Sequence, residues 1–316
     1  MRDITGLDLH ASPTTLVCKF ESQNISLYIK REDLLHPEVS GNKFRKLKYN
    51  LLEAKTGNFH TLLSFGGAFS NHIAAVAAAG HLLGFRTIGV IRGEELEDDI
   101  HITFLKNPTL RYAVSKGMKL KFVSRADYRH KSTPRFIEDL KSQLGDFFVI
   151  PEGGTNEIAV KGCEEILTDD DKDFNYICCA VGTGGTIAGL INSAQASQKV
   201  LGFPALKGNF LDKEISRYTS VENWKLVTDY HFGGYAKVSE DLIHFINDFN
   251  RKYHIPLDPV YTGKMFFGIF DLVEKGAFPQ NSRILAIHTG GLQGIEGMNL
   301  HLEKKKLPLI DTLYEK

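Results

Sequence analysis

Short apolar runs alternate with segments of helical character along the first third of the chain. The stretches TLLSF (61–65) and TIGVI (87–91) are short and apolar, which predicts two buried strands. Between them, residues 70–84 begin with a serine, are rich in alanine and end near a glycine, which predicts a helix. A strand, a helix and a second strand in this order are typical of a parallel α/β sheet with right-handed crossovers.

The same alternation returns in the second half of the chain. The stretches FNYICCAV (174–181) and RILAI (283–287) predict further strands, and each runs into a glycine-rich loop. Polar loops therefore collect at the carboxyl ends of strands, where open α/β sheets bind their ligands. The sequence contains no Pro/Ser-rich linker between two halves, so a boundary between two domains would cross the chain more than once.

Charge and hydropathy limit the class of partner. The 316 residues include 38 basic and 38 acidic side chains without a long block of one sign, which disfavours nucleic acid or an anionic membrane. Residues 56–85 carry no Asp, Glu, Lys or Arg, but their histidines, asparagines, serines and glycines are too polar for a spanning helix. The first ten residues lack the apolar core of a signal peptide. We therefore expect a cytoplasmic protein.

The four cysteines are Cys18, Cys163, Cys178 and Cys179. Their spacing fits neither a zinc ligand set nor a disulfide framework. We expect buried free thiols and no metal site.

A glycine-rich loop follows the strand predicted at 174–181. Its residues are Gly182, Thr183, Gly184, Gly185 and Thr186. Successive backbone N–H groups between a strand and a helix can bind a phosphate. A dinucleotide fingerprint would require a third glycine where Ile187 stands, and the Gly-Lys-Ser/Thr end of a Walker loop is absent. The loop suits a single phosphate, although an ordinary tight glycine turn is an equal alternative.

One lysine stands between a small polar loop and an apolar helical face in the stretch SGNKFRKL (40–47). A lysine in apolar surroundings loses its proton readily, so Lys43 is a candidate for a Schiff-base amine. Most lysines are solvated, and we expect Lys46, Lys48 and Lys55 of the same helix to be surface charges. A lysine together with a separate site for one phosphate is the pair that pyridoxal phosphate requires.

Three polar residues open the helix predicted at 70–84. Ser70, Asn71 and His72 lie where unpaired N–H groups favour a carboxylate, although a plain serine N-cap is a common alternative. Tyr261 and Thr289 are weaker candidates, because a tyrosine after a proline turn and a threonine at a strand end are usually packing and capping residues.

Four motifs, GNKFRKL, SFGGAFSNH, DPVYTGK and IHTGG, occur in this order. The chain thereby resembles the 1-aminocyclopropane-1-carboxylate deaminase/D-cysteine desulfhydrase family of fold-type-II (tryptophan synthase β-like) pyridoxal-phosphate enzymes. The resemblance covers most of the chain and is weakest around residues 101–136. It implies an α/β fold of two domains, each an open, twisted, mostly parallel sheet flanked by helices. A small domain (46–150) would be inserted in a large cofactor-binding domain (1–45 with 151–316).

The resemblance also implies roles for the candidate residues. Lys43 corresponds to the lysine that forms the Schiff base with pyridoxal phosphate and shuttles the α-proton. Asn71 would contact the phenolate oxygen of the cofactor, and Thr289 would also bind the cofactor. The phosphate would lie in the loop 182–186.

The substrate of such an enzyme is a small amino acid. By the resemblance Ser70 and His72 face its carboxylate together with Asn71, and Ser70 belongs to the catalytic residues. Tyr261 would lie beside the reacting carbons as acid, base or leaving-group partner, and Thr262 would also bind the substrate. The resemblance further implies a homodimer.

The resemblance also bears on the choice of substrate. Ring-opening deaminases of this group carry Glu, Leu and Gln where this chain has Thr262, Thr289 and His72. A threonine in place of a carboxylate at the pyridine nitrogen makes the cofactor a weaker electron sink, which suffices to eliminate a thiolate. We therefore expect α,β-elimination on a small D-amino acid, with D-cysteine giving pyruvate, sulfide and ammonia. The alternatives are a deaminase acting on the cyclopropane, a related racemase or eliminase, and a non-catalytic anion-binding protein of the same fold.

Overall fold

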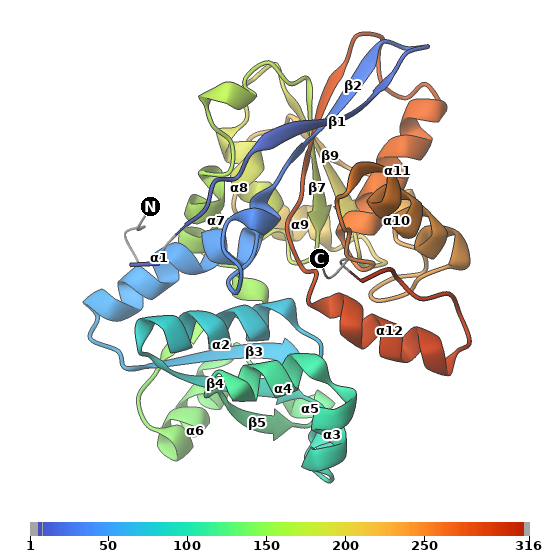
Figure 1. The fold of residues 1–316 in the computed structure, drawn as a ribbon. Helices are drawn as coiled ribbons and strands as arrows, with labels where there is room; N and C mark the ends of the chain where they lie inside the picture. Colours follow the sequence, from blue (N-terminus) through green and yellow to red (C-terminus); the bar gives the residue numbers. More distant parts are fainter. Residues whose placement is uncertain (1–5, 8, 313–316) are drawn as a thin grey trace.

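Two β-sheets organise the chain in the computed structural model, which describes residues 6, 7 and 9–312 (Figure 1). The first five residues, in which we saw no signal peptide, lie outside this part. The larger sheet has the strand order β1-β2-β10-β7-β8-β9. Its strands are β1 (Thr14–Phe20), β2 (Ile25–Lys30), β7 (Tyr176–Val181), β8 (Lys199–Pro204), β9 (Trp224–Leu226) and β10 (Arg283–Ile287).

The smaller sheet has the strand order β5-β4-β3-β6. Its strands are β3 (Thr61–Gly67), β4 (Arg86–Arg92), β5 (Lys119–Val123) and β6 (Phe148–Ile150). All pairs in this sheet are parallel, and in the larger sheet only β1 and β2 pair antiparallel. The predicted α/β class with mostly parallel sheets is confirmed.

Helices cover both faces of the larger sheet, and strand β7 shows why. Its alternate residues Ile177 and Cys179 belong to one buried cluster, whereas Cys178 and Ala180 belong to another. A strand that is apolar on both faces needs a helical layer on each side. The helices beside the first cluster are α7 (Glu157–Glu164), α8 (Gly185–Ser193) and α9 (Leu211–Ile215); those beside the second are α10 (Glu240–Tyr253) and α11 (Thr262–Glu274).

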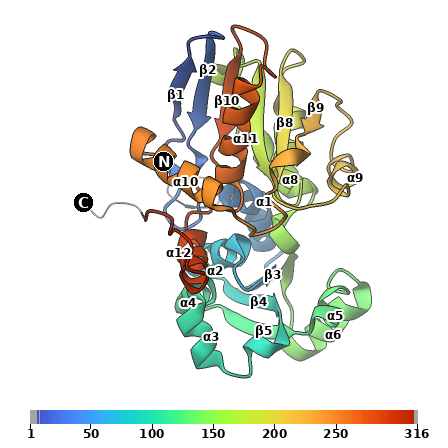
Figure 2. The ribbon, with the colours of Figure 1, turned by 90° about the vertical axis from the view of Figure 1, so that its right-hand side faces the viewer.

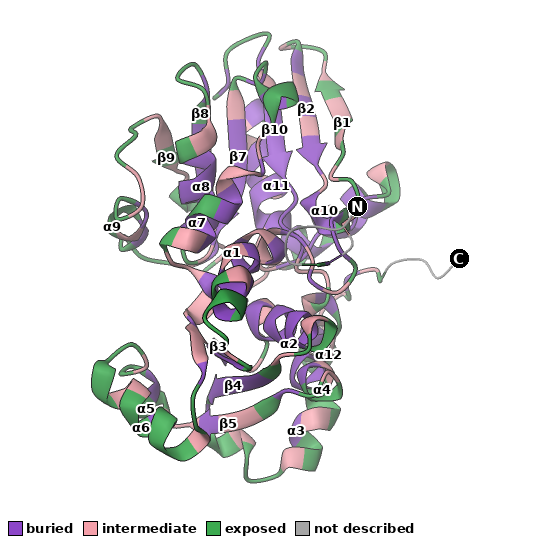
Figure 3. Ribbon diagram, turned by 90° about the vertical axis from the view of Figure 1, so that its left-hand side faces the viewer, coloured by how far each residue is buried: buried purple, intermediate pink, exposed green. Residues whose placement is uncertain are grey.

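The smaller sheet is covered in the same way. One face packs against α1 (Asn42–Thr56), α2 (Asn71–Leu83) and α4 (Pro108–Ser115), and the other against α5 (Arg125–Tyr128) and α6 (Pro134–Leu144). The remaining helices are α3 (Ile100–Lys106), α12 (Gly294–Lys304) and the 3-10 turns η1 (Glu32–Leu34), η2 (Glu94–Leu96), η3 (Glu152–Gly154), η4 (Asp169–Asp171) and η5 (Thr228–Tyr230). Burial is concentrated in the central strands and in α2, whereas α5 and α6 are largely exposed (Figure 3).

Two helices connect the sheets. Helix α1 contacts α7 beside the larger sheet and α2 beside the smaller one, and α12 lies beside α4 although it follows β10 in the chain (Figure 2). Since α1 packs beside both sheets, these contacts do not fix a boundary at residue 45. The domain bounds 46–150 and 1–45 with 151–316 stay a prediction. Within the described part, no helix combines the length and the apolar character needed to cross a membrane.

The cysteines are free thiols. Cys163, Cys178 and Cys179 are buried as predicted, but Cys18 on β1 is only half-buried. The reason is that β1 is an edge strand, whose outer side lacks a neighbouring strand.

Candidate active site

A cavity of about 830 Å³ lies between the two sheets and is lined by residues that directly follow β3, β4, β6, β7 and β10. The carboxyl ends of the parallel strands therefore meet there, as the loop positions predicted. The structure brings most of the predicted site residues to its wall, namely Lys43, Ser70, Asn71, His72, Gly182, Thr183, Gly184, Thr186, Tyr261 and Thr289. Gly185 and Thr262 are not among the residues that line it.

Lys43 lies in the first turn of α1, and a close backbone approach fixes its position. Gly41 has φ +63°, and a Cβ there would lie 2.1 Å from the carbonyl oxygen of Thr289. Only glycine permits this contact. The Lys43 amine donates to Oδ1 of Asn42 at 3.2 Å, and the Asn42 amide donates to Oγ1 of Thr186 at 2.8 Å. Asn42 therefore links the lysine to the predicted phosphate loop.

The surroundings of Lys43 favour its neutral form. Burial, and then the positive charge of Lys46, lower the pKa of Lys43 to about 7. A large fraction of this amine is therefore unprotonated near neutral pH, as nucleophilic or proton-accepting lysines require.

The loop after β7 presents backbone donors to the cavity. Gly184 has φ +86° and lies at the N-cap of α8, so the loop ends at the positive end of a helix dipole. Behind Gly182 lies the ring of Tyr261, whose Cε1 would be 3.2 Å from a Cβ at Gly182. Gly185 lies at the first position of α8, behind this wall.

Lys46 was expected to be a solvated charge, and this expectation is wrong. Its side chain is only 2% exposed, and its amine donates to Gly153 O at 3.0 Å, Thr155 Oγ1 at 2.9 Å and Thr183 Oγ1 at 3.1 Å. No described carboxylate pairs with it, and burial lowers its pKa. Residues three apart lie on the same face of a helix. The spacing between Lys43 and Lys46 could therefore have predicted that Lys46 points toward the same cavity.

The other two lysines of α1 differ from each other. Lys48 is also buried, and its charge is compensated there by Glu165 at 2.5 Å, so the expectation of a surface charge is wrong for it too. Lys55 is exposed, as predicted.

The start of α2 leaves two buried polar atoms without a partner in the described structure, Oδ1 of Asn71 and Nδ1 of His72. Buried polar atoms are rarely left unpaired, so both are candidates for ligand contacts. The hydroxyl of Ser70 accepts from the Ile73 N–H at 3.3 Å and caps the helix, so the capping interpretation also applies.

His72 is held through Nε2 by a hydroxyl from β3. The Ser64 hydroxyl lies 2.8 Å from Nε2 of His72 and 2.8 Å from the carbonyl oxygen of Ile150. Burial and the charges of Lys43 and Lys46 hold the pKa of His72 well below its usual range. A neutral His72 brings no positive charge to a carboxylate, which would find its donors at Ser70 and the helix N–H groups.

Tyr261 shares its part of the cavity with a second tyrosine that the sequence did not reveal. The rings of Tyr235 and Tyr261 are 6.3 Å apart, and burial raises the pKa of Tyr261 well above its usual range. Tyr261 therefore stays protonated and can donate. Tyr235 lies in a loop docked on α11, where Lys264 donates to the carbonyls of His231 at 2.9 Å and Gly234 at 2.8 Å.

Thr262 does not occupy the position expected of it. Its hydroxyl is fully buried and donates to Oδ1 of Asp258 at 2.7 Å, while the Asp258 carboxylate also accepts the backbone N–H groups of 260–262. The threonine belongs to the N-terminal cap of α11, and the prediction that it binds substrate is wrong. Thr289 does line the cavity and supplies a hydroxyl there.

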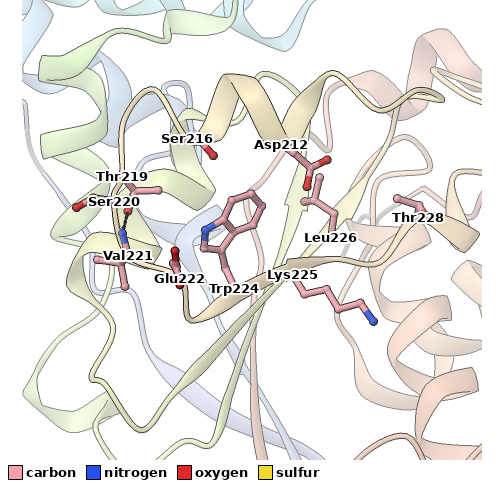
Figure 4. A pocket seen from close by; sticks show the side chains of 10 residues that line it. All are labelled: Asp212, Ser216, Thr219, Ser220, Val221, Glu222, Trp224, Lys225, Leu226 and Thr228. Atoms are coloured by element: carbon pink, nitrogen blue, oxygen red, sulfur yellow. Dashed lines mark hydrogen bonds between the residues drawn. The ribbon is translucent and has the colours of Figure 1, made fainter.

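A second hollow of about 600 Å³ lies at the β9 edge of the larger sheet, around Trp224 (Figure 4). Asp212, Glu222 and Lys225 contribute charges to it, and the Val221 N–H donates to the Thr219 hydroxyl at 3.1 Å. None of the predicted site residues lies there, so the cavity between the sheets remains the candidate active site.

The residues of this cavity fit a ligand with one phosphate and one aldehyde. Lys43 offers an amine of lowered pKa, and Asn71 offers an unpaired oxygen and an amide. The 182–186 loop and Lys46 offer hydrogen-bond donors for a phosphate, and Asn42 connects this loop to Lys43. These are the groups that pyridoxal phosphate needs.

Comparison with known proteins leads to the same class. The family described as pyridoxal-phosphate dependent enzymes matches residues 7–290. A putative 1-aminocyclopropane-1-carboxylate deaminase of Pyrococcus horikoshii is 32% identical over 303 residues, covering 90% of this chain and 89% of that protein. The bifunctional D-cysteine desulfhydrase/1-aminocyclopropane-1-carboxylate deaminase of Arabidopsis thaliana is 28% identical over 294 residues, covering 85% and 73%. A solved structure described as a homologue of the deaminase has a TM-score of 0.76 and 30% identity, covering 93% and 92%.

The fold and the cavity thus define an enzyme that depends on pyridoxal phosphate. Within that class the chain belongs to the 1-aminocyclopropane-1-carboxylate deaminase/D-cysteine desulfhydrase family, whose reactions are eliminations and deaminations.

Proposed function

We propose that the enzyme catalyses α,β-elimination on a small D-amino acid, with D-cysteine and water giving pyruvate, hydrogen sulfide and ammonia. The observation that supports this is the chemistry of the cavity wall. Its carboxylates, Glu95, Glu152 and Glu214, are each paired with a basic side chain, and the wall at residues 289–291 offers the Thr289 hydroxyl. A pyridine nitrogen facing a hydroxyl stays close to neutral, which suits a good leaving group.

The side chains of this chain divide the remaining work. Bound pyridoxal phosphate supplies the electron sink for the reaction. We assign its phosphate to the 182–186 loop and Lys46, and its ring to Asn71 and Thr289. Lys43, whose pKa is lowered to about 7, takes the α-proton of the substrate.

The substrate contacts follow from the start of α2 and from the tyrosine at the start of α11. The hydroxyl of Ser70 and the first N–H groups of the helix hold the substrate carboxylate. Tyr261, protonated because it is buried, can give a proton to the departing sulfur.

The second candidate is deamination of 1-aminocyclopropane-1-carboxylate to 2-oxobutyrate and ammonia. Relatives with this name cover most of the chain, among them the enzyme of Rhizobium rhizogenes, which is 29% identical over 299 residues. The burial of Thr262 against Asp258 also removes one of our arguments against this reaction.

Incubation of the purified holoenzyme with D-cysteine, L-cysteine and 1-aminocyclopropane-1-carboxylate tests the proposal. We expect sulfide and pyruvate from D-cysteine, and neither product from a Lys43→Ala variant. Release of 2-oxobutyrate from the cyclopropane without sulfide from D-cysteine would instead establish the second candidate.

A further inference from the structure

The outer part of the cavity has a charged rim on the side of the smaller sheet. Its charged residues are Arg92 at the end of β4, Glu95, Arg125, Lys131 and Glu152. This rim lies at the carboxyl end of the smaller sheet, where open α/β sheets bind their ligands.

The ion pairs within the rim leave one basic side chain without an acidic partner. Arg125 pairs with Glu95 at 2.6 Å, and Lys131 pairs with Glu152 at 3.1 Å. Among the described residues, no carboxylate forms an ion pair with Arg92. The rim therefore has three basic and two acidic groups, and Arg92 is the one that has no acidic partner.

Other contacts hold Arg92 at the mouth of the cavity. Its guanidinium carbon lies 5.7 Å from the ring centroid of Tyr128, whose hydroxyl donates to Glu152 at 2.9 Å. A guanidinium above an aromatic ring is attracted to the ring face, and its N–H groups remain available to a ligand. Arg92 is exposed, so an entering ligand can reach these donors.

The position of Arg92 relates it to the expected substrate. Arg92 pairs in register with Gly67 of β3, and its Nη2 would lie 3.6 Å from a Cβ at Gly67, close to the loop that leads to Ser70. Arg92 also interacts electrostatically with the hydroxyl of Tyr235. The ring of Tyr235 lies 6.3 Å from that of Tyr261. Arg92 thus lies near both the carboxylate site and the two tyrosines.

We propose that Arg92 binds a negatively charged group on the substrate side chain, so that the enzyme prefers amino acids whose side chain already carries a negative charge before elimination, such as a sulfate ester. Guanidinium groups match carboxylates, sulfates and phosphates through paired N–H donors. The inference depends on the proposed elimination. With a sulfate ester of D-serine, the Cα–H and Cβ–O bonds break, sulfate departs with the electron pair, and water converts the remainder to pyruvate and ammonia.

Matched substrates and variants test this preference. D-Serine O-sulfate and O-acetyl-D-serine have different charges but release the same pyruvate. We expect the Arg92→Gln variant to lose about 10-fold or more in kcat/KM on the sulfate, with little change on the acetyl ester. Arg125→Gln, on the same rim but paired with Glu95, is the control and should change both substrates little.

Binding without elimination provides a separate readout. D-Aspartate and D-asparagine have similar shapes and different charges, and their dissociation constants follow from the visible absorbance of the holoenzyme. We expect D-aspartate to bind more tightly, and Arg92→Gln to weaken D-aspartate alone by about 10-fold. Equal binding of the two ligands, or equal losses on both esters, would refute the inference about Arg92. Selective binding of D-aspartate without pyruvate from either ester would refute the elimination and support the subsite.

Discussion

Lys43 and Lys46 lie about one turn apart on α1, Lys46 buried and Lys43 half-buried on the cavity wall, and neither has a carboxylate within ion-pair distance among the described residues. Burial disfavours the charge of each, and the charge of Lys46 further lowers the pKa of Lys43. Lys46 retains three oxygen acceptors, whereas Lys43 has only the amide of Asn42. The pair therefore divides into a cation suited to phosphate and a free amine suited to chemistry.

The pKa of Lys43 leads to a pH dependence. Only the neutral amine attacks an aldehyde, so reaction of the apoenzyme with pyridoxal, which lacks the phosphate, should rise about 10-fold per pH unit and level off above about pH 7. Borohydride trapping and mass spectrometry of the labelled peptides measure this rate. Free Nα-acetyllysine in the same solution is the control, and its labelling should keep rising toward about pH 10. A Lys43 rate that follows the free amine would contradict the lowered pKa.

At the scale of elements, patterns within a few residues were enough to predict individual helices and strands. The helix after Ser70 and the strands at 61–65 and 174–181 were predicted because hydrophobic periodicity and caps act over a few residues. Lys46 and Tyr235 were missed because their partners come from segments far away in the chain. The error on Thr262 has a different cause, because its partner Asp258 is only four residues away, in the cap of a helix whose start the motif alone does not define.

The contact between the segment before α1 and the segment after β10 gives a prediction of its own. Gly41→Ala would force an L-residue into φ +63°, ψ −142° and place its Cβ 2.1 Å from Thr289 O. We expect a loss of more than about 3 kcal/mol in the free energy of unfolding, because a clash adds to the backbone strain. Denaturant titration measures it. The control is Gly84→Ala, at φ +77° after α2 with no atom within 4 Å of the added Cβ, which should cost only about 1–2 kcal/mol. Equal losses would show that the Gly41 contact is not tight.

At the scale of the whole molecule, the site belongs to neither sheet alone. Arg92 ends β4 of the smaller sheet, and Asn71 begins the helix that follows β3 of that sheet. The 182–186 loop and Thr289 follow strands of the larger sheet. Helix α1, which carries Lys43 and Lys46, contacts helices of both. A ligand that bridges these groups binds only when the two sheets are folded and correctly placed, so its binding energy adds to the stability of both.

This coupling predicts how pyridoxal phosphate affects unfolding. At 100 times its dissociation constant, the cofactor should raise the free energy of unfolding by about 2.7 kcal/mol. The single tryptophan, Trp224, lies in the larger sheet at β9, so its fluorescence reports on that sheet, whereas far-UV circular dichroism reports on both. If the ligand bridges the sheets, the two signals shift together. A shift in fluorescence alone would mean that the cofactor stabilises only the larger sheet.

Lys46 connects this stability effect to the site. Replacing the buried amine with the methionine side chain (Lys46→Met) removes the donor beside Thr183, and we expect cofactor affinity to fall about 10-fold. At the same cofactor concentration the stabilisation should then be smaller by about 1.4 kcal/mol. The comparison uses the gain on adding cofactor, because the substitution also changes the apoenzyme. Lys55→Met on the exposed face of α1 should retain the full gain, and an undiminished gain in Lys46→Met would place the phosphate away from this lysine.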